Sequence, residues 1–203
     1  MCGRYLVLTD DDYEEMQNII DIVSKNYKES GVAKGEVFPT NNIPVIYSHN
    51  GRKVLSVAKW GFPGYKSSGV IINARAESVH QKLMFRNAFI SNRCIVPANG
   101  YYEWLTHEDK TKTKYLIGVK GKQLFYMAGL YNMFTDKANN PYTAITIITT
   151  EASEEISFIH DRMPVILPDE AKNTWLDKNN TDVDLLKSML VPFPSALSVT
   201  RVS

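Results

Sequence analysis

The chain has 203 residues, of which 44% are hydrophobic and 22% are charged, and its formal net charge at neutral pH is +1. This size and balance predict a single globular domain over residues 1–203 with a substantial core. No apolar run is long enough to span a membrane and no signal-peptide pattern opens the chain, so we expect a cytoplasmic protein without a membrane partner.

The first predicted strand, residues 2–8, begins with a cysteine directly after the initiator methionine. A small second residue normally permits removal of Met1, so we expect a mature chain that starts at Cys2. Its α-amine and thiol would form a 1,2-aminothiol, which condenses with an aldehyde to an imine and then closes to a thiazolidine ring. The pKa of an unperturbed α-amine is about 7.7–8.0, against about 10.4 for lysine, which favours reaction at neutral pH. The alternative interpretation is a structural cysteine, buried or at a frayed end.

One helix and a series of short strands follow. Apolar residues at helical spacing after a capping box of Thr9 and Asp12 predict a helix over residues 10–25, and residues 29–42 are turn-rich. Period-two patterns predict strands at residues 44–48, 53–60, 70–74, 94–97, 100–105, 114–119, 123–131 and 142–149. Further helices are predicted at residues 80–87, 152–159, 168–175 and 182–189. This order predicts an α+β fold with a central antiparallel, barrel-like β-sheet flanked by helices.

Basic side chains concentrate in the middle of the chain. Residues 34–122 contain 14 lysines and arginines against 5 acidic residues, while both flanking segments are acidic. Aromatic residues alternate with these charges, and stacking surfaces beside cations are what single-stranded nucleic acid requires. The alternative is that the charges scatter over the folded surface and the aromatic residues fill the core.

The stretch Asn73-Ala74-Arg75-Ala76-Glu77 is the first candidate partner for Cys2. If the stretch is extended, its amide, guanidinium and carboxylate lie on one face and the two alanines on the other. Arg75 can bind a phosphate bidentately. The alternative is a structural ion pair between Arg75 and Glu77.

The second candidate partner is Glu103, which follows the turn signal Asn99-Gly100. On the predicted strand it shares a face with Tyr101 and Leu105. Such surroundings would raise the carboxyl pKa by desolvation and make Glu103 a general acid or base near neutral pH. A surface glutamate on an edge strand is the alternative.

The third candidate partner is His160, which is predicted near the end of the helix over residues 152–159 and before an apolar strand. It can titrate near physiological pH and transfer protons, although a single histidine is often structural. No other histidine or cysteine stands at ligand spacing from it, so we expect no metal. Cys2 and Cys94 show no disulfide framework, and no motif indicates a nucleotide or other cofactor.

Taken in order, these segments resemble the SOS-response-associated peptidase (SRAP) family. The similarity rests on Met1-Cys2-Gly3-Arg4-Tyr5, Trp60-Gly61, residues 73–77, residues 93–104, Ala128-Gly129-Leu130 and residues 159–167. The chain departs from the usual pattern at residues 37–41, at Asn99 and at Tyr131-Asn132, which affects the expected DNA contacts and not the expected catalytic residues.

The resemblance implies a DNA-associated monomer that binds single-stranded DNA and captures abasic sites as a covalent thiazolidine crosslink. Under this hypothesis Cys2 is the nucleophile, Asn73 orients the sugar or the amine, Glu103 is the acid or base, and His160 assists opening of the sugar. The DNA-binding residues implied are Arg4, Trp60, Arg75 and Arg162.

Two other functions fit the same residues. An N-terminal-nucleophile amidohydrolase or peptidase would also use Cys2, with its own α-amine as the base, and would act on amides without DNA. A non-catalytic nucleic-acid-binding module would need the basic and aromatic residues and not the thiol. The first experiment for all three is incubation with DNA that contains an abasic site.

Overall fold

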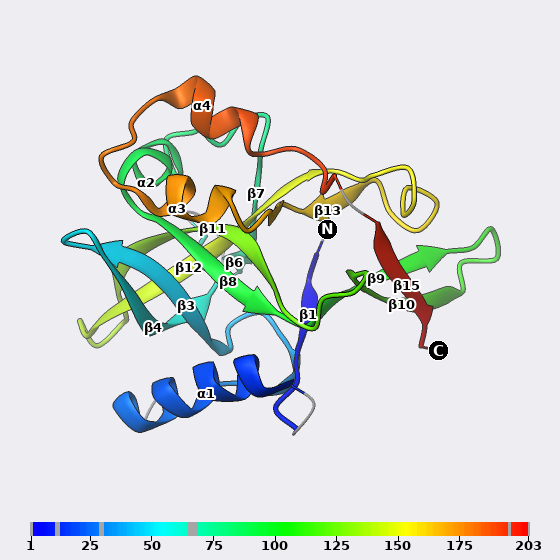
Figure 1. The fold of residues 1–203 in the computed structure, drawn as a ribbon, viewed down its shortest axis with the longest axis horizontal. Coiled ribbons are helices and arrows are strands. Elements are labelled where there is room, and N and C mark those ends of the chain that lie inside the picture. The colour runs from blue at the N-terminus through cyan, green and yellow to red at the C-terminus, as the bar shows by residue number, and fades with distance from the viewer. Residues whose placement is uncertain (1, 11–12, 29–30, 65–68, 195, 203) are drawn as a thin grey trace.

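A computed structural model describes residues 2–10, 13–28, 31–64, 69–194 and 196–202, and its centre is a closed barrel of five strands (Figure 1). The barrel strands are β3 (Asn42–His49), β4 (Arg52–Trp60), β8 (Arg93–Ala98), β11 (Phe125–Thr135) and β12 (Pro141–Glu151). They pair in the order β12-β4-β3-β8-β11, and β11 pairs back to β12. Short strands β7 (Asn73–Arg75) and β13 (Arg162–Pro164) pair with β12, and β14 (Ile166–Leu167) pairs with β11.

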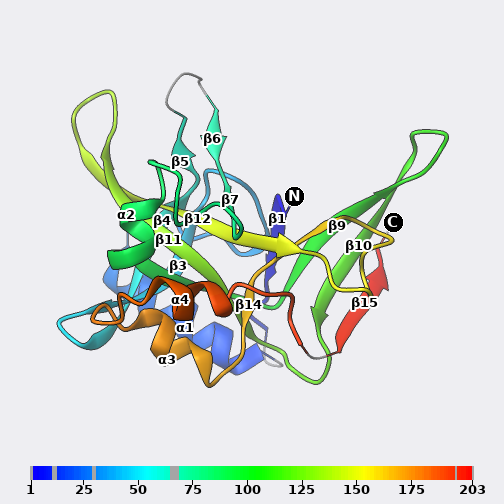
Figure 2. The same cartoon turned by 90° about the horizontal axis from the view of Figure 1, so that it is seen from above.

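A second, five-stranded antiparallel sheet lies beside the barrel. Its order is β15 (Leu197–Arg201), β10 (Lys112–Val119), β9 (Gly100–Thr106), β1 (Arg4–Val7) and β2 (Gly35–Val37). The β9–β10 hairpin projects from the body as an arm (Figure 2). Strands β5 (Phe62–Pro63) and β6 (Val70–Ile71) form a separate small hairpin.

The helices cover opposite sides of the barrel (Figure 1). On one side, α1 (Glu14–Asn26) buries Met16, Ile19, Ile20 and Val23, the face that the apolar spacing predicted. On the other side lie α2 (Arg86–Ser91), α3 (Ala171–Leu176) and α4 (Val183–Ser188). The predicted α+β class with a barrel-like sheet and flanking helices is confirmed. None of the helices described here is long and apolar enough to cross a membrane.

Two of the predicted helices are wrong. Residues 152–159 form a run of turns, because the Ala152 amide hydrogen-bonds the Asp161 carbonyl at 3.0 Å and so joins the two ends of the segment. A helix of eight residues would hold those ends about 12 Å apart. Residues 80–87 are also mostly turns, and α2 begins only at Arg86. Val79 and Phe85 are both buried, and their spacing does not fit one face of a helix.

The remaining differences concern boundaries and short strands. Helix α1 begins at Glu14 with Tyr13 as a cap that makes no side-chain bond, so Thr9 does not start the helix, and Asp12 lies outside the described residues. The predicted strand over residues 70–74 is divided into β6 and β7. Strands β2 and β15 were not predicted, because β2 has only three residues and β15 is mostly exposed, and the hydrogen bonds of each come from a partner strand distant in the sequence.

Candidate functional site

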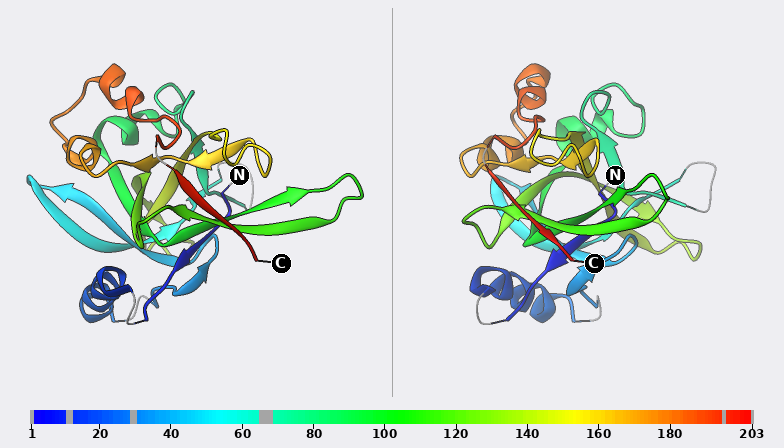
Figure 3. Two further views of the ribbon diagram at one scale, coloured as in Figure 1. Left: turned by 45° about the vertical axis from the view of Figure 1, so that its right-hand side comes forward. Right: turned by 90° about the vertical axis from the view of Figure 1, so that its right-hand side faces the viewer.

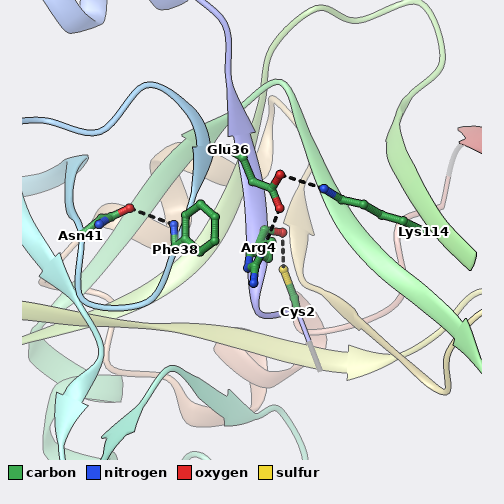
Figure 4. Close-up of polar contacts among 6 residues, drawn as sticks. All are labelled: Cys2, Arg4, Glu36, Phe38, Asn41 and Lys114. Atoms are coloured by element: carbon green, nitrogen blue, oxygen red, sulfur yellow. Dashed lines mark hydrogen bonds and ion pairs between the residues drawn. The ribbon is translucent and has the colours of Figure 1, made fainter. Parts of the chain in front are cut away.

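Cys2 lies two residues before β1, a strand of the five-stranded sheet that runs from the middle of the molecule toward α1 (blue in Figure 3). Its side chain is fully buried, and the Sγ atom lies 3.7 Å from the Arg4 carbonyl oxygen (Figure 4). Burial raises the pKa of the thiol far above its usual value, and the negative charge of Glu103 raises it further. The thiol is therefore protonated at neutral pH and needs a proton acceptor before it can react as a nucleophile.

The pairing of β9 with β1 places Glu103 close to Cys2. Arg4 lies opposite Tyr102, so Glu103 stands one residue further along β9, toward Cys2. The residue is 3% exposed, and burial raises the pKa of its carboxyl group to about 7. The interpretation of Glu103 as an exposed edge residue is wrong, and the predicted rise of its pKa by desolvation is confirmed.

Asn73 begins β7, which runs parallel to β12 beside the site. Its side-chain Nδ2 and Oδ1 atoms are both buried and find no hydrogen-bond partner among the described residues. The side-chain hydroxyl of Thr149 is also buried without a hydrogen-bond partner among the described residues. Thr149 pairs with Arg75 across β12 and β7. Buried polar atoms are nearly always bonded, so unsatisfied groups here indicate a site that receives a polar ligand or water.

His160 ends the run of turns that replaces the predicted helix. Its Nδ1 atom lies 3.0 Å from the Arg162 backbone nitrogen and 2.7 Å from Oδ1 of Asp161. The first contact requires an unprotonated Nδ1 and the second a protonated one, so only one can be a hydrogen bond at a time. Burial, together with the positive charge of Arg162, lowers the pKa of His160 even though Asp161 opposes this. We therefore assign a neutral ring that accepts from Arg162 and carries its proton on Nε2.

Arg162 forms a bidentate ion pair with Glu77. Its Nη1 and Nη2 atoms donate to the two carboxylate oxygens at 2.6 and 3.0 Å, and Nη2 also donates to the Thr149 carbonyl at 2.7 Å. The side chain of Arg162 is 11% exposed. Glu77 thus pairs with Arg162 and not with Arg75, which is exposed at the end of β7.

A shallow groove of about 420 Å³ opens beside Cys2, lined by Gly3, Arg4, Phe38, Pro39, Trp104 and Lys112. The guanidinium of Arg4 lies 3.9 Å from the centre of the Phe38 ring and donates to Glu36 at 2.8 Å, and Lys114 donates to the same carboxylate at 2.7 Å (Figure 4). Partial burial alone would raise the pKa of Glu36, but these two hydrogen bonds lower it. Sequence reasoning missed Phe38, although a phenylalanine between turn residues is a usable signal.

Trp60 requires a correction. We expected it on a wall that faces DNA, but its side chain is fully buried. Its ring contacts Tyr5 edge-on with centroids 5.4 Å apart, and its indole N–H donates to the Ile72 carbonyl at 3.1 Å. Trp60 is therefore a core residue behind β1, because its position at the end of β4 points it into the barrel.

The structure brings Cys2 and Glu103 together with Arg4 at the start of β1 and leaves Trp60 in the core. None of the four predicted catalytic residues lines the groove itself, which begins at the neighbouring Gly3 and Arg4, and none lines two other hollows of about 400 and 450 Å³. Within the part of the chain that the structure describes, no three His, Cys, Asp or Glu side chains gather to hold a metal ion. The groups at hand are thus a buried thiol, a carboxyl group whose pKa is raised to about 7, a histidine whose pKa is lowered, and a basic, aromatic groove.

Comparison with known proteins shows several relatives that match most of this chain. The chain is 39% identical to the abasic site processing protein YoqW of Bacillus subtilis, over 95% of this chain and 88% of that protein. It is 38% identical to YobE of the same organism, over 95% and 90%, and 27% identical to YedK of Escherichia coli, over 87% and 79%; both are also named abasic site processing proteins.

Solved structures show the same fold. A crystal structure of a Bacteroides thetaiotaomicron protein superposes with a TM-score of 0.83 at 25% identity, covering 100% of this chain and 92% of that one. One of a Bordetella bronchiseptica protein gives 0.76 at 22% identity and covers 100% of both chains. The model of the family described as "SOS response associated peptidase (SRAP)" matches residues 1–203. The chain therefore belongs to the SRAP family.

Proposed function

We propose that this protein binds single-stranded DNA and captures abasic sites through a covalent thiazolidine link to the mature Cys2. The observation that carries the proposal is the burial of Cys2 beside Glu103, whose carboxyl pKa of about 7 suits proton transfer at neutral pH. The names of the relatives, which are abasic site processing proteins, support the same substrate. Removal of Met1 is part of the proposal.

The reaction has two covalent steps. The α-amine of Cys2 attacks the open-chain aldehyde of the abasic sugar, and loss of water gives an imine. The thiol then adds to the imine carbon and closes a five-membered ring, an intramolecular step that needs no second encounter. Glu103 accepts the proton that the thiol releases, and the neutral His160 donates or accepts a proton as the sugar ring opens.

Asn73 and Thr149 supply the polar contacts that hold the reactants. The amide of Asn73 has a donor and an acceptor without partners, so it can bond both the α-amine and a sugar hydroxyl. These bonds would orient the amine toward the aldehyde carbon and would satisfy groups that are otherwise buried at a cost.

DNA reaches the site along the groove beside Cys2. Arg4 and the exposed Arg75 are the proposed phosphate ligands, and Phe38 and Trp104 offer faces for unpaired bases. Arg162, for which the resemblance implied the same role, is held by Glu77. In this proposal it positions two neighbours: Nη2 donates to the Thr149 carbonyl, and the Arg162 backbone N–H donates to Nδ1 of the His160 ring. We further propose that the protein acts as a monomer in the cytoplasm, where it associates with DNA.

The test is to incubate the purified protein with a single-stranded oligonucleotide that bears one abasic site. We expect a band that resists denaturing electrophoresis and an intact mass that lacks Met1 and contains the sugar adduct. Cys2→Ala and an oligonucleotide without the lesion are the controls, and neither should give a stable adduct. Absence of an adduct from protein that has lost Met1 contradicts the proposal.

The same samples test the amidohydrolase alternative. Its nucleophile would be the Cys2 thiolate, which burial and Glu103 disfavour. Cleavage of a peptide or a small amide by the wild-type protein and not by Cys2→Ala, without reaction at abasic DNA, would favour that alternative.

A further inference from the structure

Two tyrosines bury their hydroxyl groups in the interior next to Cys2. Tyr5 on β1 and Tyr101 on β9 are both 0% exposed and lie directly opposite each other in the strand pairing. Paired residues project to the same face of a sheet, and Glu103, two residues after Tyr101, shares that face. Tyr5, Tyr101 and Cys2 also belong to one buried cluster.

Neither phenol oxygen has a hydrogen-bond partner among the described residues. A buried hydroxyl without a partner is less stable than one that is hydrogen-bonded to water. Phenylalanine would fill the same space without that cost. Tyr126, by contrast, donates its hydroxyl to Glu15 at 2.9 Å. Two such hydroxyls on one face beside the reacting residue indicate a role that requires the oxygen atoms.

The electrostatics restrict what that role can be. Burial raises the pKa of both phenols well above the usual value, and a negative charge on Cys2 raises it further. Both phenols therefore stay protonated at any working pH and act as neutral O–H donors. The group that needs such donors is the sulfur of Cys2, because burial raises the thiol pKa and makes a thiolate unfavourable there.

We propose that the hydroxyls of Tyr5 and Tyr101 donate hydrogen bonds to the sulfur of Cys2 as it gains negative charge, and so speed closure of the thiazolidine ring. The inference rests on the proposed function. In this step the S–H bond breaks and its proton passes to the Glu103 carboxylate. A sulfur electron pair forms the bond to the imine carbon, the π pair of the C=N bond moves to nitrogen, and the Glu103 carboxyl group passes the proton on to that nitrogen. The phenols keep their own protons and stabilise the developing charge, as donors in an oxyanion hole do.

The experiment compares wild type with Tyr5→Phe, Tyr101→Phe and the double variant, each lacking Met1. Each protein reacts with the abasic oligonucleotide and, separately, with acetaldehyde, which needs no DNA site. Borohydride reduces the imine and leaves the closed ring, so intact mass after a timed quench separates the two adducts. We expect imine formation within about twofold of wild type and ring closure slowed about tenfold or more. The melting temperature should be equal or higher, because an unbonded buried hydroxyl is removed.

The matched control introduces the same tyrosine substitutions into the Cys2→Ala variant. That variant keeps the α-amine and can form the imine, but it has no sulfur to close the ring. In that background the tyrosine substitutions should leave the rate of imine formation unchanged. Ring closure at the wild-type rate in the double variant overturns the inference. So does an equal slowing of the imine step in the Cys2→Ala background, which would mean a structural effect. If wild type closes the ring with acetaldehyde and forms no adduct with abasic DNA, the proposed function fails while the tyrosine effect is still measured.

Discussion

Burial raises the pKa of both the Cys2 thiol and the Glu103 carboxyl group and so favours the protonated form of each. The outcomes differ because the two groups start from different pKa values. The thiol stays protonated at neutral pH, whereas the carboxyl, with a pKa of about 7, is near half ionised. One residue thus holds a proton that must be removed, and its neighbour can accept it at the pH of the cell.

This pairing predicts how ring closure depends on pH. The rate in the wild-type protein should rise as pH increases through about 7 and then level, because the carboxylate is the proton acceptor. Glu103→Gln should lose this rise and be slower by about 100-fold above pH 7. Single-turnover rates from pH 5.5 to 8.5 test it. The α-amine titrates in both proteins, so the difference between the two profiles isolates Glu103, and parallel profiles would exclude it as the acceptor.

The same carboxyl group should destabilise the fold at high pH. Its pKa is raised from 4.5 to about 7 on folding, so between these values the unfolded chain is ionised while the folded protein still binds the proton. Stability should therefore be complete below about pH 4.5, fall as pH rises to about 7 and stay low above it. We expect Glu103→Gln to match wild type near pH 4 and to exceed it by on the order of 2 kcal/mol at pH 8. Urea unfolding at the two pH values measures this, and a variant less stable at pH 8 would contradict it.

At the scale of elements, Arg93 joins α2 and the segment that contains α3 to the barrel. It is 2% exposed, and its guanidinium donates to the backbone carbonyls of Phe89, Ile90, Trp175, Asp177 and Asn180. Burial lowers its pKa to about 10 against the opposing effect of Asp177, so it remains charged at neutral pH. Four of these carbonyls lie in the last turn or at the C-cap of α2 and α3, where helices leave carbonyls without intrahelical partners, and the fifth, Asn180, lies in the segment that follows α3.

Replacement of this one side chain should loosen both helices. Lysine keeps the charge and can make at most three of the five bonds, so Arg93→Lys should lower stability by about 2–4 kcal/mol. Arg52→Lys, at an exposed strand position, is the matched control and should change stability by less than about 0.5 kcal/mol. Urea unfolding compares the two, and equal effects would mean that the carbonyls find other donors. Rates of crosslinking at low temperature should not differ.

The elements also show how far the sequence alone predicts this protein. The apolar spacing of α1 was sufficient because a single buried face decides a helix on a barrel surface. The apolar spacing gave the wrong prediction for residues 152–159. There the conformation depends on a backbone hydrogen bond between Ala152 and Asp161 and on the contact of Phe158 with Tyr115. Such contacts join residues far apart in the chain or across a loop, and local spacing does not record them.

For the candidate site too, the sequence predicted some features and missed others. The strand pattern correctly predicted that Glu103 is desolvated, because the residues around it are its own neighbours in sequence. The alternative interpretation of residues 73–77 paired Glu77 with Arg75, but Glu77 forms its ion pair with Arg162, which lies 85 positions away. Phe38 and the phenols of Tyr5 and Tyr101 gain their meaning only from the pairing of β1 with β2 and β9.

At the scale of the whole molecule, the basic middle of the sequence does not become a single positive face. Arg93 is buried, and Arg52 lies at the β3–β4 turn, far from the start of the chain (Figure 1). Lys114 of the five-stranded sheet donates to Glu36, the same carboxylate that Arg4 contacts, and Arg75 is exposed at the end of β7. The charge that can meet DNA at the site therefore comes from a few side chains on separate strands, and the net charge of a segment overstates it.

This distribution predicts which arginine controls the salt dependence of DNA binding. Each phosphate contact to single-stranded DNA contributes about 0.7 to the slope of log K against log salt, because bound counterions are released. Arg75→Ala should weaken binding and lower the slope by about that amount, whereas Arg52→Ala, which removes the same charge at the distant turn, should change neither. Titrations of fluorescent oligonucleotide with protein in the Cys2→Ala background, at salt from 50 to 300 mM, avoid the covalent step. Equal changes in the two variants would mean that DNA responds to overall charge, and Arg75 would then lose its proposed role as a phosphate ligand.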